Sequence, residues 1–108
     1  MTEMIIYNDF QKLDLRVGRI LEAERIAGTD KLMKLQVDVG EKIQPVAGIA
    51  DNYSADELID ENIIVLVNLV SRKLKGVESH GMLLAAVVDG KSVLLTTDRD
   101  ANLGDSVM

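Results

Sequence analysis

The sequence predicts a single all-β domain, and three features of the 108-residue chain lead to this prediction. Apolar and polar residues alternate from Met33 to Val39, which is the period of a half-buried strand. Two continuous apolar runs, Ile63–Val67 and Met82–Val88, have the length of buried strands. Asp89-Gly90 then marks a two-residue hairpin turn. A chain of this length can bury its own core without disulfides or metals.

The chain is expected to begin with one helical turn and then a long strand. Asn8 or Asp9 can cap the free N–H groups of a turn over residues 11–13. Apolar residues from Leu15 to Ala23 predict the first strand. Gly18 lies inside it, and a glycine there often marks a bulge or sharp bend.

The middle of the chain predicts a third strand followed by a short helix. The strand runs from Lys42 to Ala50, and Pro45 confines that portion to a sheet edge or a bulge. The segment from Ser54 to Glu57 has the pattern of a capping box, which starts a helix. This helix is expected to point Leu58 and Ile59 inward.

The element order favours a small Greek-key barrel. Buried strands are expected at 62–69 and 82–88, and residues 92–97 return as a hairpin partner. Five or six short strands, with one short helix between the third and fourth, are typical of the five-stranded OB-fold. We therefore expect one domain over residues 1–108, with an N-terminal extension at 1–14 and a C-terminal extension at 98–108. The second extension is expected to wrap the surface or a second subunit.

The composition limits the ligands and the cellular locations that can be expected of the protein. The net charge is −6, which opposes nucleic-acid binding by bulk attraction. The chain has no cysteine, which excludes a disulfide framework and fits a reducing cytoplasm. Its first ten residues do not resemble a signal peptide, and no apolar run approaches the length of a membrane span. A cytoplasmic location is the expectation.

A basic segment separates the two buried apolar runs. Arg72, Lys73 and Lys75 fall within four residues, and Gly76 permits a turn directly after them. Clustered cations of this kind can donate charge-assisted hydrogen bonds to phosphates. Aromatic residues make up only 3% of the chain, so contact with phosphate and shape is expected rather than base stacking.

Five segments in order resemble the tRNA-binding OB domain. They are DFQKLDLRVGRI (9–20), DKLMKLQVDVG (30–40), VAGIA (46–50), NLVSRKLKGVESHGMLLAA (68–86) and GDSV (104–107). That domain forms the C-terminus of bacterial methionyl-tRNA synthetases and the core of endothelial-monocyte-activating polypeptide. It also occurs alone as a small homodimeric tRNA-binding protein, and the resemblance is to this stand-alone form.

The resemblance implies a non-catalytic homodimer without a cofactor that recognises the shape of folded tRNA. Such a module would act in trans, like a beta subunit, beside methionyl-tRNA synthetase or another aminoacyl-tRNA synthetase in protein biosynthesis. The dimer contacts are expected at residues 1–13 and in the tail after Thr97.

The resemblance and the basic segment together indicate a tRNA-binding site. Its expected members are Lys31, Lys34, Asn68, Arg72, Lys73, Lys75, Ser79, His80 and Met82. The bases would contact phosphates, while Asn68 and Ser79 can also bond ribose 2′-hydroxyl groups, which distinguish RNA from DNA. Asn68 can alternatively hold the strand end, Ser79 can serve the turn, and Met82 can belong to the core.

The chain departs from the family pattern around this site. Members commonly have a proline at Ser71, an acid at His80 and a base at Gln44. Many also carry bases where this chain has Ala50 and Asp51. The smaller number of bases lowers the affinity expected of a single domain.

His80 leads to a prediction about pH. A histidine side chain ordinarily gains a proton below pH of about 6.5, which would add a cation beside the basic segment. We therefore expect tighter RNA binding at pH 6 than at pH 8, measured as the dissociation constant at fixed salt. An unchanged constant over this range would remove His80 from the site.

Two other classes of function compete with tRNA binding. A secretion-associated chaperone family shares the fold and length, so a chaperone-like or protein-interaction homodimer is the alternative; client peptides without tRNA in a pull-down would favour it. An enzyme is disfavoured, because the chain has one histidine, no cysteine and no spacing typical of a catalytic triad. The carboxylates and glycines likewise form no metal-binding or phosphate-binding motif.

Overall fold

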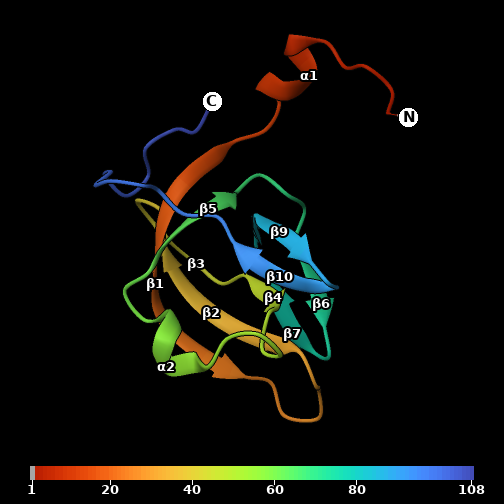
Figure 1. The fold of residues 1–108 in the computed structure, drawn as a ribbon, viewed down its shortest axis with the longest axis vertical. Coiled ribbons are helices and arrows are strands. Elements are labelled where there is room, and N and C mark those ends of the chain that lie inside the picture. Colours follow the sequence, from red (N-terminus) through yellow and green to blue (C-terminus); the bar gives the residue numbers. More distant parts are fainter. Residues whose placement is uncertain (1) are drawn as a thin grey trace.

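The computed structural model describes residues 2–108. Within that range the chain forms two short helices and ten strands (Figure 1). They are α1 (Tyr7–Gln11), β1 (Leu15–Arg25), β2 (Leu32–Asp38), β3 (Lys42–Ile43), β4 (Val46–Gly48), α2 (Ala55–Leu58), β5 (Asn62–Leu66), β6 (Arg72–Leu74), β7 (Val77–Ser79), β8 (Met82–Leu83), β9 (Ala85–Val88) and β10 (Lys91–Leu94). No helix in this range is long and apolar enough to cross a membrane.

The long strand β1 organises the main sheet, whose order is β3-β2-β1-β5-β8, with β4 also paired to β2. The first half of β1 pairs with β5 and the second half with β2, and both pairings are antiparallel. In Figure 1 this strand runs through most of the height of the domain. The predicted all-β OB-fold is confirmed, with α2 in its expected place before β5.

Gly18 has a different role from the one predicted. The irregularity in β1 lies between Ile20 and Glu22, whereas Gly18 stays in register opposite Ile63. A Cβ atom on Gly18 would lie 2.9 Å from Cγ1 of both Val37 and Val39. The glycine therefore allows close packing of β1 against core side chains, and the bulge considered at this position is absent.

The alternating strand supplies the centre of the core, as predicted. Its four apolar side chains are fully buried, while the residues between them are partly exposed. Residues of β1, β5, β8, α2 and the segment after β4 complete the cluster. Its members are Ile20, Met33, Leu35, Val37, Val39, Ile49, Ala50, Leu58, Ile63, Val65 and Leu83.

The two helices differ from prediction at their ends. In α2 the capping box is present, with the Ser54 backbone N–H donating to Glu57 Oε2 at 2.8 Å, and Leu58 is buried. Ile59 is 40% exposed, because an extended backbone at this residue ends the helix and turns its side chain outward. Asn8 and Asp9 lie inside α1 rather than before it, and Ile6 occupies the N-cap position without a side-chain hydrogen bond.

The predicted strands near Pro45 and after Gly81 are each interrupted. Pro45 divides its strand into β3 and β4, and the later run divides at Leu84 into β8 and β9.

The C-terminal tail returns to the first half of β1. Gly104 N–H donates to the Val17 carbonyl oxygen at 2.8 Å, and Val17 N–H donates to the Asp105 carbonyl oxygen at 2.9 Å. The tail thus wraps the domain's own surface, one of the two expected arrangements.

Candidate nucleic-acid interface

The predicted basic loop is a β-hairpin. Strands β6 and β7 form their own two-stranded sheet, which we call the basic hairpin (residues 72–79). Its turn consists of Lys75 and Gly76, with φ angles of 52° and 80°. Two successive residues with positive φ are typical of the type I′ turn, which matches the twist of the paired strands. The cations therefore sit on an ordered element rather than on an irregular loop.

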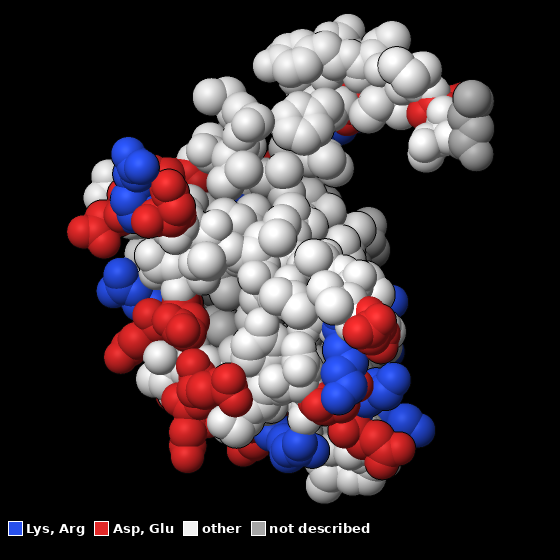
Figure 2. All heavy atoms as spheres, viewed as in Figure 1, with Lys and Arg blue, Asp and Glu red and all other residues white. Residues whose placement is uncertain are grey.

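The side chains of Arg72, Lys73 and Lys75 are all exposed. None of the ion pairs found within residues 2–108 involves them. Figure 2 shows Lys and Arg side chains gathered over β6 and β7 at the lower right, with some carboxylates among them. Glu78 is one carboxylate close by, because it lies opposite Lys73 in the hairpin register. The hairpin thus presents three cations that no ion pair neutralises.

Lys31 joins this surface from a different part of the chain. Together with Lys75 it lines a shallow hollow between the β1–β2 connection and the tip of the basic hairpin. Lys34, on β2, forms an ion pair with Glu24 at 3.1 Å and is only partly exposed. The structure therefore brings Lys31 to the basic hairpin, whereas Lys34 carries a neutralising partner.

Asn68 uses its amide to hold the chain before β1. Its Oδ1 accepts a hydrogen bond from Asp14 N–H at 2.9 Å, and its Nδ2 donates to the Lys12 carbonyl oxygen at 2.7 Å. Asp14 also accepts two hydrogen bonds from Arg16, and these bonds together with its charge raise the pKa of that guanidinium. This arrangement favours the structural alternative for Asn68 over a direct RNA contact.

Ser79, His80 and Met82 lie in different environments. Ser79 is 3% exposed and its Oγ accepts a hydrogen bond from Val46 N–H at 3.0 Å, which favours the structural alternative for this hydroxyl over an RNA contact. His80 is exposed directly after β7. Met82 is 43% exposed on β8, which favours a contact role over the core alternative.

Gln44 belongs to this region and was not predicted as a functional residue. Its Nε2 donates to the Glu78 carbonyl oxygen at 2.8 Å, and its Oε1 accepts from Gln36 Nε2 at 2.8 Å. These partners are far apart in sequence, so no local pattern could have indicated them. Gln44 replaces a base that the resemblance led us to expect, and its amide connects the sheet to the basic hairpin.

Across the part of the chain that the structure describes, no three His, Cys, Asp or Glu side chains are grouped closely enough to hold a metal. The exposed basic hairpin instead offers charge-assisted hydrogen bonds to an anionic polymer.

A family model described as "Putative tRNA binding domain" matches residues 15–106. The chain belongs to this tRNA-binding domain family. Methionine–tRNA ligases contain similar segments: that of Methanothrix thermoacetophila is 52% identical over 101 residues, which cover 94% of this chain and 15% of the ligase. The ligase of Caldanaerobacter subterraneus is 51% identical over 106 residues, covering 97% of this chain and 17% of the ligase. The domain thus spans about a sixth of these relatives.

Solved structures of two kinds are similar to this tRNA-binding domain. A MetRS-related protein from Pyrococcus horikoshii has a TM-score of 0.93 and 38% identity, covering 99% of this chain and 100% of that one. The CsaA chaperone protein from Picrophilus torridus has a TM-score of 0.89 and 34% identity, covering 97% and 100%. The fold is therefore shared by proteins described as synthetase-related and as chaperones.

Proposed function

We propose that this domain binds folded tRNA and acts in trans as an auxiliary module of an aminoacyl-tRNA synthetase, most directly the methionyl enzyme. The observation that carries the proposal is the exposed basic hairpin, whose three cations are free of ion pairs within residues 2–108. Membership of the tRNA-binding domain family supports the choice of ligand. The similarity to methionine–tRNA ligases over nearly the whole domain supports the choice of enzyme.

Binding would proceed through backbone phosphates and shape. Arg72, Lys73, Lys75 and Lys31 are the proposed phosphate contacts, and Met82 offers an apolar surface to a sugar or base. Folded RNA presents phosphates on both sides of its grooves, so a projecting hairpin can contact it without reading the sequence. The acidic remainder of the domain would repel RNA and limit contact to this edge. The domain contributes binding rather than catalysis.

The proposal is tested by purifying the protein from its native cells under mild conditions. Sequencing the bound RNA and identifying the bound proteins distinguishes the relevant outcomes. We expect tRNA together with a synthetase. A preparation that contains peptides or unfolded proteins and no tRNA would contradict the proposal.

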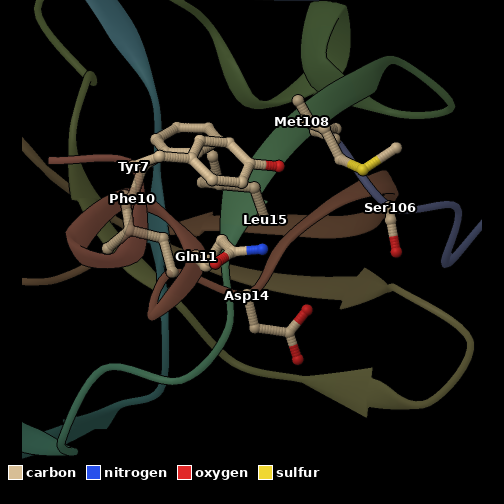
Figure 3. Close-up of a pocket in the computed structure, with 9 residues that line it drawn as sticks. Tyr7, Phe10, Gln11, Asp14, Leu15, Ser106 and Met108 are labelled. Carbon is tan, nitrogen blue, oxygen red and sulfur yellow. The ribbon is translucent and has the colours of Figure 1, made fainter.

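We further propose that the domain is a homodimer paired through its two extensions. The segment before β1 carries exposed apolar side chains, with Met4 90% exposed. It projects from the body of the domain in Figure 1, near the C-terminus. Figure 3 shows a hollow between α1 and the tail, lined by Tyr7, Phe10 and Leu15 and by Met108 at the chain end. A second copy inserted here would remove this apolar surface from water.

Removing residues 1–13 is expected to give a folded monomer. Residues 2–13 contribute no side chain to the buried core, so far-UV circular dichroism should be retained. Affinity for tRNA should fall about 10-fold or more, because two linked sites gain through effective concentration. Analytical ultracentrifugation measures the mass. A truncated protein that is still dimeric would show that the interface lies elsewhere.

A chaperone-like function is the second candidate, and the hairpin formed by β9 and β10 favours it. Val87 on this hairpin is 75% exposed, and the face of the domain drawn in Figure 2 has a broad uncharged centre. Exposed apolar surface suits unfolded peptides, and the similarity to CsaA chaperones supports this alternative. Suppression of client aggregation by the wild-type protein, and equally by a variant that lacks the three cations of the basic hairpin, would favour this function over tRNA binding.

A further inference from the structure

The end of the basic hairpin is held by residues 44–46, which join β3 to the start of β4. Gln44 Nε2 donates to the Glu78 carbonyl oxygen at 2.8 Å, and Ser79 Oγ accepts from Val46 N–H at 3.0 Å. The backbone N–H of His80 donates to the Gln44 carbonyl oxygen at 2.9 Å. Three hydrogen bonds therefore connect the last residues of the hairpin and the residue after it to residues 44–46.

This joining segment is itself fixed to the core strand β2. Gln36 Nε2 donates to Gln44 Oε1 at 2.8 Å, and Leu35 N–H donates to the Pro45 carbonyl oxygen at 3.0 Å. The side chains of Leu35 and Pro45 are fully buried. Gln44 thus connects the core strand β2 to the basic hairpin, because its amide oxygen accepts from Gln36 and its amide nitrogen donates to Glu78.

The hairpin depends on such support. Its strands have three residues each and form a sheet separate from the main one. An isolated two-stranded hairpin is only marginally stable in water. Ligand binding to an unordered segment must also offset the loss of its conformational freedom, so a hairpin held in place before binding gives higher affinity.

We infer that Gln44 is a positioning residue for RNA binding, which holds the basic hairpin against the sheet so that Arg72, Lys73 and Lys75 meet the RNA backbone together. The inference rests on the proposed tRNA-binding function. Gln44 acts through the Glu78 carbonyl group and contributes no charge. Removing its amide should therefore weaken binding without changing the number of phosphate contacts.

The first test replaces Gln44 by methionine, which has a similar volume and lacks the hydrogen-bonding groups. Hydrogen exchange of the hairpin amides and of His80 is measured in the free protein, and tRNA affinity is measured over a range of salt concentrations. We expect exchange to become about 10-fold faster, the dissociation constant to rise about 5-fold, and the slope of log K against log salt to stay the same. As a matched control, Asn52→Met removes an exposed amide that donates to the Ser92 carbonyl oxygen and takes no part in the hydrogen bonds of the basic hairpin, so it should leave hairpin exchange unaltered.

A second variant, Gln44→Lys, separates positioning from charge. Its ammonium group can still donate to the Glu78 carbonyl oxygen and adds a cation, so hairpin exchange should be close to wild type. The slope of log K against log salt should become steeper by up to about one, which corresponds to one additional phosphate contact.

If Gln44→Met leaves either hairpin exchange or affinity unchanged while wild type binds tRNA, the inference is overturned. Wild-type protein that does not bind tRNA overturns the proposed function itself. Gln36→Met, which leaves the bond to Glu78 in place, provides a milder variant should Gln44→Met not fold.

Discussion

Replacing Arg72, Lys73 and Lys75 together by glutamine is expected to lower affinity for folded tRNA by about 100-fold at low salt. Each replaced cation removes one charge-assisted phosphate contact and the counterion release that accompanies it. The slope of the logarithm of the association constant against log salt should therefore become shallower by about two to three. All three side chains are exposed, so the thermal unfolding temperature should change little.

A control variant with the same change in net charge isolates the effect of position. Lys42, Lys91 and Arg99 are exposed bases outside the basic hairpin and its neighbouring hollow, and Arg99 pairs with Asp98. Replacing these three by glutamine should weaken binding by a few-fold at most. Equal losses in the two triple variants would show that bulk charge, rather than the hairpin, determines affinity.

The largest effect on stability is expected at Gly81, between β7 and β8. Its φ angle is 78°, and a Cβ atom there would lie 2.9 Å from the carbonyl oxygen of Leu66, which is backbone and cannot move aside. Gly81→Ala should lower the free energy of unfolding by about 3 kcal/mol, from the strain of positive φ together with the clash. Chemical denaturation measures this change.

Gly76 provides a matched comparison for this substitution. Its φ angle is 80°, but a Cβ atom there would have nothing within 4 Å. Gly76→Ala should therefore cost only the strain of positive φ, about 1 kcal/mol. Equal losses for the two variants would mean that the contact with Leu66 has no energetic consequence.

Local patterns in the sequence were sufficient for the central strand and the tight turns, but not for the strand divisions at Pro45 and Leu84 or for the two strands of the basic hairpin. Alternation from Met33 to Val39 identified the central core strand, and Asp89-Gly90 identified a hairpin whose turn residues both have positive φ. The capping box predicted at the start of α2 is also present. The bulge considered at Gly18 lies instead between Ile20 and Glu22, and the close approach of two valines from elsewhere in the chain accounts for this glycine.

The roles of uncharged site residues could not be predicted, because they depend on contacts between distant segments. Asn68 bonds to the backbone of Lys12 and Asp14, and Ser79 bonds to that of Val46. Neither pairing leaves a periodic signal in the sequence. The exposure of the charged residues was easier to predict, since lysine and arginine side chains are mostly found at the surface, and their contacts with RNA stay predictions.

The salt dependence of tRNA binding by the wild-type protein tests the central claim most directly. With Lys31, Arg72, Lys73 and Lys75 as phosphate contacts, the slope of log K against log salt should be about −3 for each subunit. A slope near zero, at any affinity, would contradict binding through the basic hairpin.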